Sequence, residues 1–271
     1  MNTTPASSDV GFAPLTIEGD PANGLLLICD HAENRIPSHY GTLGLEPGAL
    51  MRHIAWDPGA RAVTLALARR LGAPAVLSRF SRLLIDPNRG RDDPTLIMRL
   101  SDRAAIPGNR HIDDRERCER IERYYAPYDA AVGAAIERAL ATGIAPAIVS
   151  IHIFTPVWRG RGRPWQVGIL WDADPRLAVP LIERLRAGSD LVVGDNEPYT
   201  GNLVGDTLYR HATRRGLANA LIEIRQDLIA DDDGAETWAE RLAPILADLN
   251  RDPEVHTIRH FGSRAGPIDA V

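Results

Sequence analysis

Two histidines of this chain stand at or inside strongly apolar stretches, and carboxylates accompany them. His31 lies two residues after the end of the apolar run LLLIC, and His152 lies within the stretch AIVSIHIFTP. Asp57 begins a helical pattern, and Glu223 lies in the apolar stretch ALIEI. Histidine and carboxylate ligands on separate segments are typical of a catalytic zinc site, which takes three protein ligands and leaves a position for water. A separate glutamate could then act as general base.

Each of these residues also has an ordinary structural interpretation. A histidine in an apolar strand, such as His152, is commonly a hydrogen-bonded core residue. Asp57 could cap a helix, and Glu223 could form an ion pair with Arg225, which lies on the same strand face. Asp86 could begin a simple turn. Taken together, several polar strand ends in one chain favour a functional site.

The elements that would position these residues alternate between strands and helices. Apolar runs predict strands at Leu25–Cys29, Ala75–Ser78, Leu83–Ile85, Ala147–Ile151, Val167–Trp171, Leu191–Val193 and Ala220–Ile224. Helical patterns cover residues 57–72, 113–141, 175–187, 204–215 and 235–249. This order predicts an α/β fold with a mostly parallel sheet covered on both faces. In such sheets ligands bind outside the carboxyl ends of the strands.

The rest of the chain suggests one domain with short extensions. We expect a loose lead-in over residues 1–20, one domain over 21–250 and a tail over 251–271. The segment 88–111 is long for a connection and could be a lid or binding loop. The loop 194–202, GDNEPYTGN, follows a predicted strand and could close over a ligand.

Composition excludes several classes of function. All 31 basic residues are arginine, so Schiff-base chemistry and a P-loop lysine are impossible. The net charge is −5 and the arginines are scattered, which argues against a nucleic-acid partner. No G-x-S-x-G or G-x-G-x-x-G motif follows a strand. Cys29 and Cys118 do not suggest a disulfide framework. Without a signal-like or membrane-spanning stretch, we expect a cytoplasmic protein.

Six blocks of sequence resemble the N-formylglutamate amidohydrolase family, in particular a branch described as predicted amidohydrolases. The blocks are CDHAENRIP, HIAWDPGA, SRLLIDPNR, SIHIFTPVWRG, NEPYTG and IEIRQDLI. They occur in the right order between about residues 24 and 249. The resemblance implies a three-layer α/β/α domain like those of zinc carboxypeptidases and aspartoacylase. It also implies zinc-dependent hydrolysis of an N-acyl amino acid, such as formylglutamate.

The resemblance also implies roles for single residues. His31 and His152 match the family's histidines and are expected to bind one zinc ion, with Asp57 as third ligand. Glu33 or Asn34 could replace Asp57, because the related carboxypeptidase motif is H-x-x-E. Glu223 falls where such enzymes keep the general base. The expected substrate-binding residues are Asp86, Asn88, Arg89, Arg163, Asn196 and Arg225.

Arg89 would grip a substrate carboxylate with its two-pronged guanidinium group. Two alternatives to an N-acyl amino acid amidohydrolase remain open. One is a peptidase or amidase that acts on a peptide or cell-wall fragment. The other is a non-catalytic small-molecule binding protein of the same fold. The remaining histidines are interpreted as surface or structural residues: His39, His53, His111, His211, His256 and His260.

Overall fold

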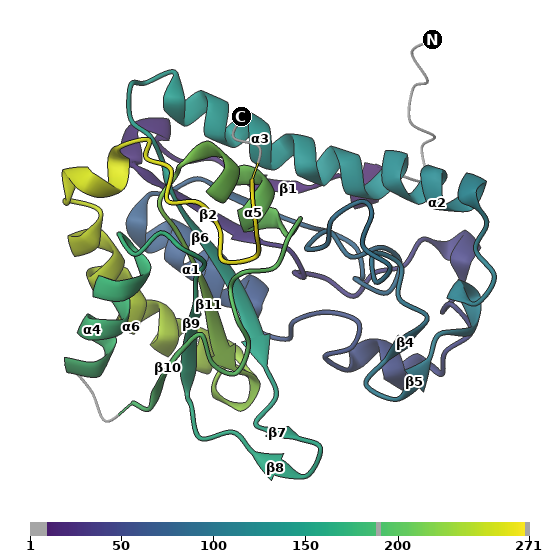
Figure 1. Ribbon diagram of the computed structural model, residues 1–271. Coiled ribbons are helices and arrows are strands. Elements are labelled where there is room, and N and C mark those ends of the chain that lie inside the picture. The colour runs from purple at the N-terminus through teal and green to yellow at the C-terminus, as the bar shows by residue number, and fades with distance from the viewer. Residues whose placement is uncertain (1–9, 188–190, 269–271) are drawn as a thin grey trace.

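The computed structural model describes residues 10–187 and 191–268. Its centre is a seven-stranded sheet with the order β1-β3-β2-β6-β11-β9-β10 (Figure 1). The strands of this sheet are β1 (Leu15–Ile17), β2 (Leu25–Cys29), β3 (Ala75–Leu77), β6 (Ala147–Phe154), β9 (Val167–Leu170), β10 (Val193–Asp195) and β11 (Asn219–Arg225). Two small hairpins stand apart from it: β4 (Leu100–Ser101) with β5 (Ala104–Ala105), and β7 (Val157–Trp158) with β8 (Arg161–Gly162).

The sheet is mixed, with a parallel centre. Strands β3, β2, β6 and β11 run parallel, whereas β1 is antiparallel to β3 and β9 is antiparallel to β11. The register of β6 and β11 places His152 beside Glu223. Because β2, β6 and β11 point the same way, their carboxyl ends meet at one edge of the sheet. The predicted mixed α/β sheet is confirmed.

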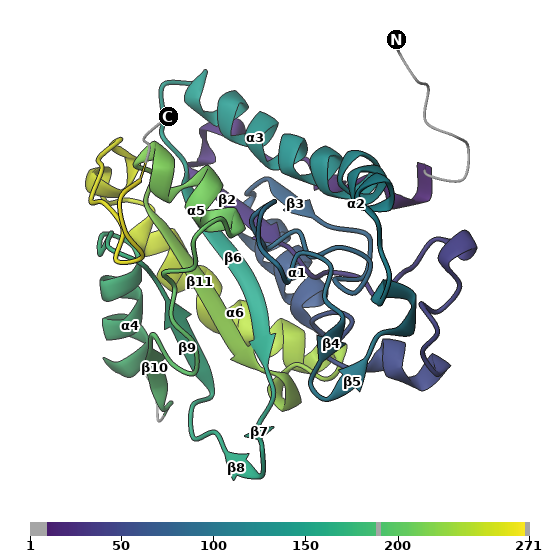
Figure 2. The same cartoon turned by 45° about the vertical axis from the view of Figure 1, so that its right-hand side comes forward.

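Helices cover both faces of the sheet (Figure 2). The helices are α1 (Ala60–Leu71), α2 (Asp114–Arg120), α3 (Ala126–Leu140), α4 (Ala178–Ala187), α5 (Thr207–His211) and α6 (Asp232–Leu249). Helices α1, α4 and α6 pack on one face, while α3 and α5 pack on the other. A single π-helical turn, Ile121–Tyr125, joins α2 to α3. The predicted three-layer α/β/α architecture is therefore confirmed.

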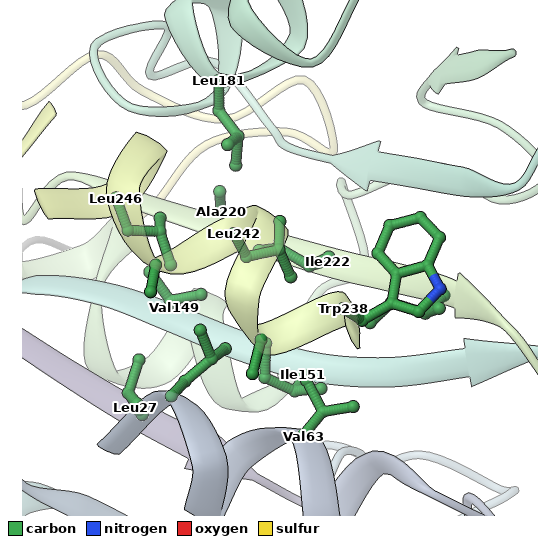
Figure 3. Packing of buried hydrophobic residues seen from close by; sticks show 14 of the residues in the cluster. Leu27, Val63, Val149, Ile151, Leu181, Ala220, Ile222, Trp238, Leu242 and Leu246 are labelled. Carbon is green, nitrogen blue, oxygen red and sulfur yellow. The ribbon is translucent and has the colours of Figure 1, made fainter. Parts of the chain in front are cut away.

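The buried side chains of β2 show why its sequence is continuously apolar. Leu27 and Cys29 face the cluster that contains α1 and α6, whereas Leu26 and Ile28 face the cluster that contains α3. A strand covered on both faces has no polar side to present to water. Figure 3 shows the first of these clusters, in which side chains of α1, α4 and α6 meet those of β2, β6 and β11.

One predicted strand is wrong. Leu83–Ile85 forms a turn in place of a strand, because the Leu84 N–H bonds to the Ser81 carbonyl and the Ser81 hydroxyl donates to the carbonyl of Ala55. All three apolar residues are buried. A short apolar run is equally compatible with a buried turn, so burial alone did not distinguish the two. This turn delivers Arg82 and Asp86 to the site described below.

The segments outside the predicted domain are ordered where the structure describes them. Within the lead-in, Leu15–Ile17 forms the edge strand β1 and pairs with β3, so this part is not loose. In the tail, Val255 is buried and the guanidinium of Arg264 lies over the ring of Trp171. The tail thus packs on its own chain. Among the described residues, no helix combines the length and apolarity needed to cross a membrane.

Candidate active site

Three predicted metal ligands meet at the carboxyl edge of the sheet. Residue His31 follows β2, His152 lies on β6, and Asp57 stands in the loop before α1, where its N–H bonds to the His31 carbonyl. Asp57 Oδ2 lies 3.3 Å from His31 Nδ1 and 2.9 Å from His152 Nδ1. All three side chains are buried, and one ligand atom from each lies within 4.8 Å of the others. Asp57 does not cap α1, whose N-cap is Gly59.

The other ring nitrogen of each histidine faces a second buried carboxylate. His31 Nε2 lies 2.7 Å from Asp86 Oδ1, and His152 Nε2 lies 3.0 Å from Asp30 Oδ2. Both nitrogens of each ring therefore face a carboxylate, which accepts hydrogen bonds: Nε2 faces Asp86 or Asp30, and Nδ1 faces Asp57. Metal-binding histidines commonly have such a carboxylate behind them, which fixes the tautomer and the ring orientation.

Asp30 is held by an unusually complete set of donors. The hydroxyls of Thr207, Tyr128 and Ser150 donate to it at 2.6, 3.0 and 3.2 Å. Although burial raises its pKa, the hydrogen bond and charge of His152, together with the charge of His31 and the hydrogen bond from Thr207, bring the pKa of Asp30 below its ordinary value. Burial lowers the pKa of His152, but the neighbouring carboxylates Asp30 and Asp57 raise it more strongly, to about 10. The cluster therefore has an excess of negative charge around its imidazoles.

Glu223 stands next to this cluster with an unused oxygen. It lies beside His152 in the register of β11 and β6 and is buried. Its Oε2 has no hydrogen-bond partner, and burial raises the pKa of its carboxyl to about 8. The alternative ion pair with Arg225 is wrong, because Arg225 donates to both carboxylate oxygens of Asp227. A buried, unpaired carboxyl is costly unless a ligand or ion completes its contacts.

A cavity of about 500 Å³ opens onto these groups. His31, Asp57, His152 and Glu223 all line it. Its volume falls in the range of small-molecule sites, and its wall includes several buried polar groups. The arrangement can therefore hold a cation and place a proton acceptor beside it, at the edge where α/β sheets bind their ligands.

The two alternative third ligands lie elsewhere. The Glu33 carboxylate is surrounded by the guanidinium groups of Arg35, Arg61 and Arg79, at 3.5 to 3.7 Å. The Asn34 amide donates to the carbonyl of Leu50. Neither residue belongs to the metal-capable cluster or lines the cavity. The structure thus supports Asp57 over both.

The residues predicted to bind substrate divide into two groups. Asn88 and Arg89 line the cavity, whereas Asp86 lies behind His31 and bonds to Arg82 and to the Asn88 N–H. Asn88 and Arg89 are the only described residues of the segment 88–111 that line this cavity. It is anchored instead through Asn109 and therefore does not act as a lid in this structure.

Three other predicted substrate-binding residues do not line the cavity. The Asn196 side chain accepts the N–H groups of Trp171 and Gly201 and so shapes the loop 194–202. Arg225 is engaged by Asp227. Arg163 lies over the rings of neighbouring aromatic residues at the mouth. Each of these three residues supports the local structure, because its polar groups already have protein partners.

Sequence reasoning missed other residues that line the cavity. Arg82 donates to Asp86 at 2.8 Å, and its Nη1 lies 3.9 Å from Asp57 Oδ1. Its spacing of four residues from Asp86 was the available signal. His53 was interpreted as surface or structural, but it lines the cavity, with Asp102 at 3.6 Å. Burial lowers its pKa.

Asp206 also lines the cavity and caps α5 by accepting the Tyr209 N–H. Burial raises its pKa to about 7. The folded protein therefore binds more protons than the unfolded chain between about pH 4 and 7, and the stability contributed by this group falls as pH rises through that window. Above pH 7 the full cost of the buried charge remains.

Asp206→Asn is therefore expected to raise the melting temperature at pH 8 and to have little effect at pH 4.5. Asparagine caps a helix as well as aspartate and cannot ionise. The gain should be roughly 2–4 °C for each 1 kcal/mol of relief. Thermal unfolding at both pH values measures it, with Asp113→Asn, an exposed cap of α2, as control. An equal gain at both pH values would contradict the role of the buried charge.

The fold and the site together define the class of the protein. A buried His–Asp–His cluster with an adjacent glutamate, at the carboxyl edge of a mixed α/β/α sheet, is the arrangement of a hydrolase. The family model for N-formylglutamate amidohydrolase matches residues 23–230. The chain belongs to the N-formylglutamate amidohydrolase family, as its sequence blocks indicated.

The chain is also similar to solved structures. A gene product of Agrobacterium tumefaciens is similar at 39% identity with a TM-score of 0.82, over 88% of this chain and 95% of that one. The N-formylglutamate amidohydrolase of Ralstonia eutropha JMP134 shares the fold at 23% identity with a TM-score of 0.61, again over 88% and 95%. None of the curated proteins matches the chain.

Proposed function

We propose that the protein hydrolyses the amide bond of an N-acyl amino acid with a free α-carboxylate, using one zinc ion per chain. N-Formylglutamate is the reference substrate, because the family is named for it. The observation that carries the proposal is the unpartnered Oε2 of buried Glu223 beside the His–Asp–His cluster. Release of formate from N-formyl-L-glutamate, before and after treatment with a chelator, tests it.

The cluster fits a metal ion by the chemistry of its donors. His31 Nδ1, His152 Nδ1 and Asp57 Oδ2 would hold the ion, and Asp86 and Asp30 would orient the two rings. Two nitrogen donors and one carboxylate form a common ligand set for catalytic zinc. When bound, zinc acts as a Lewis acid and makes water more acidic. A cation there would also favour the ionised form of Glu223.

Glu223 would perform the proton transfers of the reaction. Its buried carboxylate accepts a proton from the attacking water and returns it to the nitrogen of the leaving amino acid. The wall around it is formed by strands β6 and β11, whose rigid register keeps the carboxylate beside His152. A base on strands is held more precisely than one on a mobile loop.

Arg89 would hold the substrate carboxylate. It lines the cavity, and no carboxylate of the described residues lies within ion-pair distance of it. Its Nη1 donates to the Asn88 carbonyl and its Nε to Thr95, which orient the guanidinium group. Arg82 also lines the cavity, but Asp86 already engages it. Arg89 is thus the better partner for a substrate anion.

Arg89→Lys is expected to lower kcat/KM for N-formyl-L-glutamate by about 100-fold or more. An ammonium group cannot reproduce the bidentate contact with a carboxylate, and breaking a buried pair costs about 3–5 kcal/mol. Steady-state kinetics measure the loss. Arg91→Lys, a nearby arginine that does not line the cavity, is the control. Equal wild-type activity on the substrate's α-carboxamide would disprove the contact.

A further inference from the structure

The mouth of the cavity carries exposed apolar side chains. Trp158 on β7 and Tyr199 and Leu203 in the loop after β10 line the cavity and are 37%, 43% and 37% exposed. The β7–β8 hairpin extends beyond the end of the sheet in both views (Figures 1 and 2). Large apolar side chains gathered at the entrance of a polar cavity indicate a ligand-binding surface.

The aromatic residues at this mouth are held in place by Arg163. Its guanidinium lies 5.4 Å from the ring centre of Trp158 and 4.9 Å from that of Tyr199. It also donates to the Tyr199 hydroxyl at 3.0 Å. Cation–π contacts of this kind fix the rings relative to each other. The hairpin and the loop therefore form one preformed wall, and a ligand need not order it.

The cavity wall has two chemically different kinds of side chain. Its apolar side chains come from residues 153–221, whereas both of its arginines come from residues 82–89. Arg82 adjoins Asp57, and Phe154 follows His152 on the same strand by two residues. The wall thus offers arginines for an anion and, at the mouth, an apolar side for an uncharged group. An amide substrate at the cluster could place its carboxylate against the arginines and an apolar substituent against the apolar side.

We propose that the apolar side, formed at the mouth by Trp158, Tyr199 and Leu203, binds an extended aliphatic acyl group. This inference rests on the proposed function, in which Arg89 holds the amino-acid carboxylate. A formyl group offers only a hydrogen to the apolar side and would leave it exposed to water. The preferred substrate is then an N-acyl amino acid with several methylene groups in the acyl chain.

The test uses the zinc-loaded enzyme and N-formyl-, N-acetyl- and N-hexanoyl-L-glutamate. The acetyl and hexanoyl amides have similar electronic character, so their ratio reports contacts of the chain. We expect kcat/KM for the hexanoyl substrate to exceed that for the acetyl substrate by about 10-fold or more, since a single methylene in an apolar pocket can contribute about 10-fold. Trp158→Ala should remove most of this ratio.

Val157→Ala is the matched control, because Val157 lies on the same hairpin and does not line the cavity. It should leave the ratio intact. A ratio near one, or equal losses on both substrates in Trp158→Ala, overturns the inference. If Trp158→Ala lowers kcat/KM for N-acetyl-L-phenylalanine and not for the hexanoyl substrate, the wall binds the amino-acid side chain and the acyl assignment is wrong. Hydrolysis of formylglutamate alone overturns only this inference, whereas inactivity on every acylglutamate overturns the proposed function as well.

Discussion

Glu223→Gln is expected to lower kcat by about 100-fold or more while the protein folds and binds zinc normally. Glutamine has nearly the same shape as glutamate but cannot accept the proton of the attacking water. The fold should tolerate the change, because no hydrogen bond to Glu223 Oε2 is lost. Turnover, metal content and melting temperature measured on one preparation separate the two effects.

Glu33→Gln is the matched control for this experiment. Glu33 is also partly buried near the site, yet its carboxylate faces three arginines and does not line the cavity. This variant should keep kcat within about twofold of the wild type, with any loss confined to stability, as for a partly exposed ion pair. A Glu223→Gln enzyme that turns over normally but melts earlier would remove Glu223 from the mechanism.

The second large effect concerns the metal. Purified enzyme is expected to contain one equivalent of zinc, and the double variant His31→Ala, His152→Ala is expected to contain almost none. The variant leaves Asp57 as the one remaining donor of the cluster, and one carboxylate does not hold zinc firmly. Elemental analysis after dialysis measures the metal, and circular dichroism reports whether the variant is folded.

His53→Ala provides the matched control, because His53 lines the same cavity but does not belong to the metal-capable cluster. It should retain its zinc. Asp57→Asn is a milder second variant. It preserves the shape of the side chain and should weaken zinc binding without removing the two buried imidazole rings. Stoichiometric zinc in the double variant would show that the metal is bound somewhere else.

The strands and their polar ends could be predicted from sequence because each is a local pattern. The apolar run of β2 predicted its bounds, and His31 followed at once. His152 proved to lie inside β6, which is longer than predicted and runs to Phe154. Parallel strands place such residues at one edge whatever their separation in sequence. Periodicity and strand order therefore indicated that His31, His152 and Glu223 lie at one edge, whereas the ligand role of Asp57, which lies on a loop, was implied by the resemblance to the family.

Residues on turns and loops could not be predicted in the same way. Arg82 reaches the cavity because the turn after Ser81 is fixed by a bond to the Ala55 carbonyl, a contact between distant segments. His53 and Asp206 are likewise placed by tertiary packing. Strand alternation suggested an ion pair between Arg225 and Glu223. In the structure β11 ends at Arg225, which forms its ion pair with Asp227. Alternation predicts a shared face, and it does not predict which of two carboxylates will pair.

The position of β11 constrains the order in which the molecule can assemble. Of the strands in the sheet it is the last to be synthesised, yet it lies between β6 and β9. Until it emerges from the ribosome, β9 and β10 have no strand that joins them to the rest of the sheet. The facing sides of β6 and β9 then present unpaired backbone groups, a template for aggregation. Nascent or prematurely terminated chains should accordingly require protection by chaperones, and release of the finished C-terminal third should trigger closure of the sheet.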